Sequence, residues 1–239
     1  MSQFKFKSEW VLEGALIVGS ILLALAAEAW WSNLKEKRAG QELLELLRAQ
    51  YHENLSAIED QITRHEQKDD QARELLKISS GEIPWPGYED VAALLQPLFL
   101  YDSYDSSSGA VTSFLTSENP GLIEDQQLKT YLASWPSLLE ENSEDEQRII
   151  DFIDNQFKPY IRSSIPFGDA FDLAGASSFF GSFNQTRSNP DILPMIKSLD
   201  FSNLMVERAM LERIVLRENR TLLEAGREIL NLINNELDE

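Results

Sequence analysis

A run of apolar residues near the N-terminus constrains this chain more than any other feature. Residues 11–27 read VLEGALIVGSILLALAA, and Glu13 is the one charged residue among them. A helix of this length rises about 1.5 Å per residue and reaches roughly 26 Å, close to the hydrocarbon thickness of a bilayer. Tryptophans, which prefer the membrane–water boundary, flank the run on both sides: Trp10, Trp30 and Trp31. The pattern predicts a transmembrane helix over residues 10–31.

A cleavable signal peptide is the alternative interpretation of this run. Lys5 and Lys7 resemble its charged start, and Ala24-Leu25-Ala26 resembles a cleavage site. The paired tryptophans that follow are placed as an interfacial belt, which favours an anchor that stays uncleaved.

Small and polar residues recur at helical spacing inside the predicted membrane helix. One set falls near a single face at spacings of seven, four and four, and a small-xxx-small pair lies on a neighbouring face: Glu13, Ser20, Ala24 and Glu28, then Ala15 and Gly19. Such residues let membrane helices approach closely and form hydrogen bonds across the contact. They predict contact with a second copy or with another membrane protein. Snorkelling of Glu13 to the boundary and a small oligomeric pore that uses Glu13 are the alternatives.

Composition excludes several classes of function. The chain has 40 acidic and 21 basic residues among 239, a formal net charge of −19, which repels nucleic acid. It has no cysteine and only two histidines, His52 and His65, so thiolate and multi-histidine metal sites are excluded. No nucleotide-binding, zinc-protease or serine-hydrolase motif occurs. We therefore expect no cofactor and no metal, and the remaining enzyme hypothesis is a membrane-tethered carboxylate site.

Periodicity predicts an all-α protein. Residues 1–9 form a short tail, residues 10–31 the membrane helix, and residues 32–239 an acidic, bundle-like domain. A stripe at spacings of three and four predicts a long helix over residues 32–79, in a bundle or in a coiled coil between subunits: Leu44, Leu47, Tyr51, Leu55, Ile58, Ile62, His65, Asp69, Ala72 and Leu76. A second long helix, residues 200–237, is expected to pack antiparallel to it.

Several local features are expected between and within these long helices. The membrane helix is expected to continue into the first long helix either directly or with a break near Gly40. Short helices are predicted from Asp90 to Leu100, from Ala110 to Ser117, from Glu124 to Glu140, and from Ser143 to Tyr160. Ser143 and Glu146 read as a capping box, and the acids around them suit a helix N-terminus better than a calcium loop. Asp200 or Ser202 is expected to cap the final helix. Residues 163–189, rich in Ser, Gly and Phe, are expected to fold over a core.

The stretch EGALIVGSILLALAAEAWW resembles the opening of an uncharacterised bacterial family of single-pass membrane proteins. In that family a glutamate enters an apolar run and a tryptophan follows it, as Glu13, Ala24, Leu25 and Trp30 do here. Ser20 stands where the family usually has glycine. The resemblance extends through ELLELLRAQYHENLSAIEDQI and SYDSSSGAVTSFLTSENPGLIEDQQLKTYLASW. It implies no established activity, but it implies an N-terminus inside the cell.

The combined interpretation is a non-enzymatic scaffold, accessory subunit or sensor of the bacterial inner membrane, with its domain in the periplasm. The basic residues on the two sides of the membrane helix nearly balance and so do not decide its orientation by themselves: Lys5 and Lys7 precede it, and Lys35, Lys37 and Arg38 follow it. The lipid bilayer and a second copy or another membrane protein are the expected partners.

We predict that protease added to intact spheroplasts digests the domain and leaves an anchor fragment that resists carbonate washing. The physical reason is the apolar run with its interfacial tryptophans. Immunoblotting against tags at the two termini measures both outcomes. Protection of the domain until lysis would place it on the cytoplasmic side, and recovery of a soluble chain that begins near Ala27 would refute the anchor.

Overall fold

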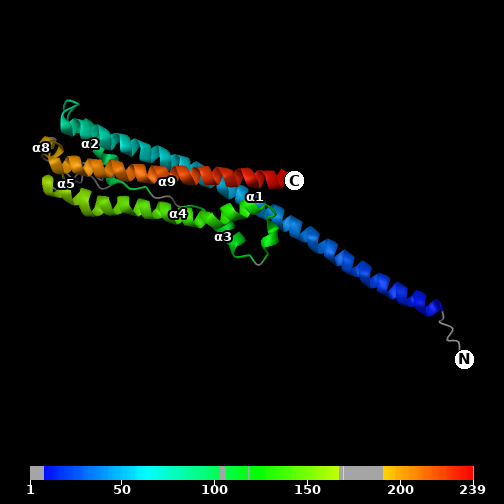
Figure 1. Ribbon diagram of the computed structural model, residues 1–239. Helices are drawn as coiled ribbons and strands as arrows, with labels where there is room; N and C mark the ends of the chain where they lie inside the picture. The colour runs from blue at the N-terminus through cyan, green and yellow to red at the C-terminus, as the bar shows by residue number, and fades with distance from the viewer. Residues whose placement is uncertain (1–7, 103–105, 118, 167–168, 170–190, 239) are drawn as a thin grey trace.

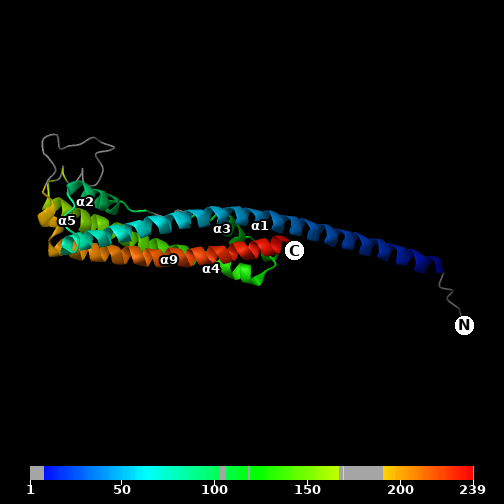
Figure 2. The ribbon, with the colours of Figure 1, turned by 90° about the horizontal axis from the view of Figure 1, so that it is seen from above.

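The computed structural model of the chain describes residues 8–102, 106–117, 119–166, 169 and 191–238. All regular elements within these ranges are helical, and none is a strand, so the predicted all-α class is confirmed. Figures 1 and 2 show an elongated molecule in which a bundle occupies one half and a single helix projects from it towards the N-terminus.

The projecting helix and the first helix of the bundle are one element, α1 (Ser8–Ser80), of 73 residues. Of the two predicted alternatives, a direct run and a break near Gly40, the direct run is confirmed, because the helix passes through this residue without interruption. The need for glycine at this position comes from packing, because a Cβ at Gly40 would collide with the carbonyl oxygen of Leu122. Gly40 therefore lets the connecting chain approach the helix backbone.

The N-terminal part of α1 stands outside the bundle, and its apolar side chains are exposed. Leu16 and Leu23 are 67% and 74% exposed. Among the described helices, α1 is the one long and apolar enough to cross a membrane, and none of its apolar window is buried within the molecule. This agrees with the predicted membrane helix, because exposed leucines at such density are costly in water and favourable in lipid.

Three long helices form the bundle. The C-terminal part of α1 and α4 (Gln126–Phe152) run away from the projecting segment, and α9 (Leu199–Asp238) returns antiparallel to both (Figure 1). The predicted antiparallel packing of the two long helices is confirmed, and α1 and α9 share the most extensive contact in the fold. The apolar stripe of α1 therefore packs against other helices of the same chain.

Short elements connect α1 to α4. They are α2 (Tyr88–Leu95), the 3₁₀ turn η1 (Gln96–Phe99), α3 (Gly109–Leu115) and the 3₁₀ turn η2 (Pro120–Leu122), and each of them contacts α1. Buried amides of α1 hold the backbone here. Asn54 donates to the carbonyl of Ser107 at 2.8 Å and accepts from its N–H at 3.1 Å, while Gln50 accepts from the N–H of Ala110 at 2.7 Å.

The two helices expected over residues 124–140 and 143–160 are fused. α4 continues through Pro136 and through the predicted capping box, so that box is wrong: Ser143 and Glu146 lie inside the helix. Burial of Trp135 and Asn142 on one side of α4 favours helix on both sides of the proline. A π-turn, η3 (Ile153–Phe157), then leads into α5 (Lys158–Ser164).

The final helix begins differently from the prediction. Ser198, and neither Asp200 nor Ser202, accepts the N–H of Phe201 at 3.0 Å, next to the short α8 (Leu193–Ile196). Tyr160 bonds Ser198 at 2.7 Å and so ties α5 to this corner. The segment 163–189 lies almost wholly outside the described residues, so its expected role stays a prediction.

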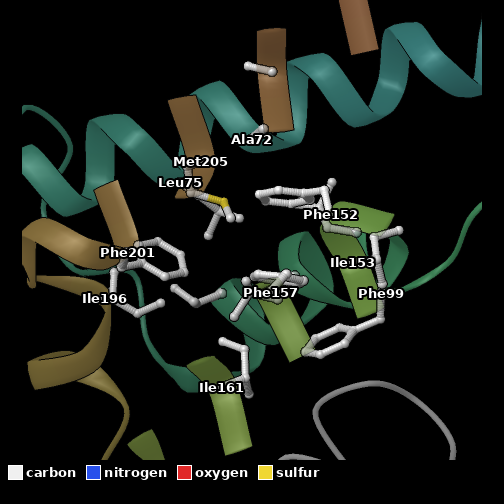
Figure 3. Packing of buried hydrophobic residues seen from close by; sticks show 14 of the residues in the cluster. Ala72, Leu75, Phe99, Phe152, Ile153, Phe157, Ile161, Ile196, Phe201 and Met205 are labelled. Carbon is white, nitrogen blue, oxygen red and sulfur yellow. The ribbon is translucent and has the colours of Figure 1, made fainter. Parts of the chain in front are cut away.

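Two apolar clusters fill the bundle. The proximal cluster, nearer the projecting segment, is centred on Tyr51 and Trp135, whose rings meet edge to face at 5.0 Å. The distal cluster surrounds Phe157, whose ring lies 4.8 Å from that of Phe99 (Figure 3). Figure 3 shows residues of α1, η1, α4, η3 and α9 converging there. Both clusters draw on all three long helices, so each joins the whole bundle.

We predict that Gly40→Ala lowers the stability of the domain by about 1–3 kcal/mol, the usual cost of overpacking. In an open helix the same change stabilises by up to about 1 kcal/mol, so the sign is diagnostic. Chemical denaturation followed by circular dichroism measures it. Gln41→Ala, at an exposed position of the same turn, is the control and should change stability by less than about 0.5 kcal/mol. A stabilised Gly40→Ala variant would contradict the close packing on Leu122.

Candidate functional site

Heptad seams run along the long helices of the bundle. In α9 the buried positions alternate at spacings of four and three without a break: Phe201, Met205, Arg208, Glu212, Val215, Asn219, Leu222, Gly226, Ile229 and Ile233. In α1 a matching series follows spacings of three and four: Leu44, Leu47, Tyr51, Asn54, Ile58, Gln61, His65, Lys68, Ala72, Leu75 and Ser79. This repeat is typical of left-handed coiled-coil packing within a bundle.

Polar side chains occupy the middle of these seams. We call them the buried polar layer, and they are Gln61, His65 and Lys68 of α1, Asn142 and Glu146 of α4, and Arg208, Glu212 and Asn219 of α9, all buried. On α1 and α4 the layer falls between residues of the proximal and distal clusters. The bundle therefore consists of two apolar cores separated by a charged layer.

Glu212 is the centre of this layer. One of its carboxylate oxygens lies 2.5 Å from Nδ1 of His65 on α1, and the other lies 2.6 Å from Nη2 of Arg208, one turn earlier on α9. His65 is 1% exposed, and Arg208 and Glu212 are fully buried. The carboxylate thus joins α9 to α1 through His65, and this contact is sealed from water.

A second pair closes the layer from the side of the connecting chain. Lys68 Nζ lies 2.5 Å from a carboxylate oxygen of Asp102 and donates to the carbonyl of Leu100 at 3.0 Å. Arg208 also donates to that carbonyl, at 3.5 Å. The backbone after η1 therefore accepts from both buried cations, and Asp102 supplies a second negative charge.

Burial sets the electrostatics of the layer. It lowers the pKa of the Arg208 guanidinium, because desolvation disfavours the charged form, and the carboxylates of Glu212 and Asp102 oppose this shift. Several polar atoms of the layer have no hydrogen-bond partner among the described residues: Nε2 of His65, Nε and Nη1 of Arg208, and both amide atoms of Asn219. Such groups destabilise a core.

A layer of this kind fixes packing register more than it adds stability. Buried ion pairs are often replaceable by apolar residues without loss of stability, while polar residues at heptad positions select one register. Sliding α9 by one heptad would separate Glu212 from His65 and place charges in the apolar clusters. The layer can therefore hold α1 and α9 in one relative position. Because His65, Arg208 and Glu212 are sealed from water, a dissolved substrate does not reach them in this conformation.

The predicted membrane contacts lie elsewhere, on the projecting part of α1. Glu13, Ala15, Ser20, Ala24 and Glu28 are exposed and Gly19 is partly so. No atom of another element lies within 4 Å of a Cβ built on Gly19, so the small face is open. Ser20 donates to the carbonyl of Ile17 at 2.8 Å, which satisfies its hydroxyl within the helix.

The tryptophans predicted to lie at the membrane interface flank the apolar stretch of α1. Trp30 and Trp31 are exposed on α1, and Lys35 lies over the ring of Trp31 at 5.8 Å from its centroid. The helix backbone includes Trp10, but its side chain lies outside the described part.

Sequence analysis placed His65 and Asp69 together in the stripe of the first long helix. The structure separates them, because Asp69 accepts from Arg73 at 2.9 Å and from Arg213 at 3.3 Å, while His65 faces Glu212. No group of metal-binding side chains occurs within the described residues. The layer itself was missed because Arg208 and Glu212 are charged, and an apolar stripe search passes over them. The strict heptad phase of α9 would have found them.

No protein-family model, curated protein or solved structure matches the chain. The geometry of the chain itself therefore carries the functional argument.

We predict opposite effects from breaking the layer and from replacing it. Glu212→Ala leaves Arg208 buried without its carboxylate and should destabilise the domain by about 3–5 kcal/mol. Replacing His65, Arg208 and Glu212 together by Leu, Met and Leu removes all three polar groups and should be neutral or stabilising by about 1–4 kcal/mol. Thermal and chemical denaturation of the purified domain measure both. A triple variant as unstable as Glu212→Ala would mean that the layer contributes stability, contrary to its assignment as a register device.

Proposed function

We propose that the chain is a single-pass membrane protein without catalytic activity, a scaffold, accessory subunit or sensor that assembles through its membrane helix. One observation carries the proposal: the helix whose apolar stretch is fully exposed is also one of the three long helices of the bundle. The exposed leucines call for lipid or a partner helix. The continuous helix supports a role as scaffold, accessory subunit or sensor, because any movement of the membrane segment about its axis moves the bundle with it.

The buried polar layer supports a mechanical role in this proposal. Within the layer, the contact between His65 and Glu212 joins α1 to α9, so α9 follows α1 as one body. A domain held in one register suits a protein that positions a partner or reports the orientation of its anchor. The sealed charges favour this role over the carboxylate enzyme, because they offer no open cleft for a substrate.

The membrane helix supplies the assembly face of this proposal. Ala15 and Gly19 have small side chains that let another helix approach closely, and Glu13, Ser20 and Ala24 lie on the adjoining face. In lipid the gain from association comes from close packing and interhelical hydrogen bonds, since hydrocarbon already surrounds the apolar side chains. The partner is a second copy or another membrane protein. We place the membrane as the bacterial inner membrane and the acidic domain on its periplasmic side, as the resemblance implies.

We predict that the full-length protein self-associates in lipid nanodiscs or retains a membrane partner in gentle detergent, and that Gly19→Leu abolishes this. Leucine keeps the segment apolar while it pushes a neighbouring helix away. Each polar contact contributes only about 0.6 kcal/mol on average, so Glu13→Gln alone should weaken association modestly. Mass photometry and co-purification measure the complex.

Gly14→Leu is the matched control, because it makes the same substitution on a different face of the same helix, and a Cβ at Gly14 would also meet no other part of the described chain within 4 Å. It should leave association intact. Association that survives Gly19→Leu but fails with Glu13→Gln would move the contact to the carboxylate face. A wild-type chain that is monomeric at physiological density and retains no partner would refute the proposal.

A further inference from the structure

The outer seam between α1 and α9, on the distal part of the bundle, holds a groove of about 540 Å³. We call it the seam groove. Its apolar floor comes from Leu76 of α1 and from Val206 and Met210 of α9, and its rim from Arg73, Arg213 and Arg217. Val206 and Met210 are 55% and 54% exposed, although a water-facing helix surface is normally polar.

The charge of the groove is opposite to that of the chain. The formal net charge is −19, yet none of the described residues that line the seam groove is acidic and three are arginines. Arg73 and Arg213 share a single carboxylate, that of Asp69, at 2.9 Å and 3.3 Å. Arg217 pairs with Glu218, the next residue on its own helix, at 2.7 Å. The rim therefore has one guanidinium more than the carboxylates paired with it.

We propose that the seam groove binds an acidic amphipathic helix of another protein. Two packed antiparallel helices leave a furrow that fits a third helix, whose apolar residues one turn apart would rest on Val206 and Met210. Acidic residues beside that apolar line would meet Arg73, Arg213 and Arg217, and guanidinium–carboxylate contacts can be bidentate. The occupant is thus defined by an apolar stripe flanked by carboxylates.

The position of the groove argues against two other occupants. α1 rises about 1.5 Å per residue, so the groove at Arg73 lies roughly 60 Å along the helix from Trp31, beyond the reach of the lipid that holds the anchor. Copies anchored side by side in one membrane bring residues of equal height together, so the arginines would face arginines. This argument rests on the membrane anchoring proposed above, whereas the charge argument does not.

The test places a photoreactive benzoyl-phenylalanine at Met210 of the full-length chain in the membrane of the source cell. The control position is Asn231, which is exposed on the same helix outside the groove. Mass spectrometry of the adduct identifies the crosslinked segment. We expect an adduct at Met210, and none at Asn231, with a segment of another protein that has an apolar helical stripe and an excess of Asp and Glu.

Charge reversal tests the recognition. The variant R213E/R217E should lose the adduct, and Arg227→Glu should keep it. Arg213 and Arg227 form a matched pair, since each side chain is 59% exposed on α9 and each bonds a carboxylate of α1, Asp69 or Glu59. If the double variant unfolds by circular dichroism, Arg217→Glu replaces it, because Arg217 is 74% exposed and pairs within its own helix.

An adduct with a second copy of the chain, with lipid, or with a segment that lacks acidic excess would overturn the proposal. So would the absence of any adduct, or an adduct that survives charge reversal. None of these results affects the association measured with Gly19→Leu, so failure of the groove and failure of the membrane assembly are distinguishable.

Discussion

The unbroken backbone hydrogen bonding of α1 is the constraint on which the rest of the structure depends. It runs from Ser8 to Ser80 and makes the apolar projecting segment and the first long helix of the bundle one element. Of the other long helices, α9 packs along this rod directly, and α4 is placed through its contact with α9. An anchor that is continuous with the core of its domain differs from an anchor on a flexible linker, because it fixes the orientation of the domain relative to the membrane normal.

The buried polar layer defines the register in which α9 packs along α1. Two apolar clusters of similar shape would tolerate a slip of α9 along α1 by a heptad, since leucine and isoleucine seams are similar at each repeat. Glu212 opposes such a slip, because only one register places its carboxylate against His65 of α1. The same arrangement explains how a strongly acidic chain accommodates charge in its interior. The outer seam, by contrast, keeps its arginines at the surface, where they remain available to another molecule.

The sequence predicted the helical class, the long apolar helix near the N-terminus, the two long helices and their antiparallel packing, because each rests on a run or a period of hydrophobic residues that local sequence displays. It failed where tertiary contact overrides local signals. Gly40 allowed either a break or a direct run but accommodates the Leu122 carbonyl, and Ser143 with Glu146 looked like a cap but lies inside a helix stabilised by burial. The polar layer was hidden for a related reason: a charged residue at a heptad position reads as surface until its partner on another helix is known. The membrane contacts of Glu13 and Gly19 remain predictions.

The most direct measurement of the account is the distance across the junction between anchor and bundle. The chain has no cysteine, so Leu25→Cys and Gln67→Cys, both at exposed positions of α1, can each carry a nitroxide label. Pulsed electron paramagnetic resonance in nanodiscs then reports the distance between the two labels of one chain, with the labelled chain diluted in an excess of unlabelled chain so that associated copies add no distances. A continuous helix predicts one narrow distance distribution centred at about 63 Å, the rise of an α-helix between residues 25 and 67. A broad distribution, or a distance much shorter than this, would show that α1 bends or breaks between membrane and bundle, and would contradict the rigid coupling on which the account depends.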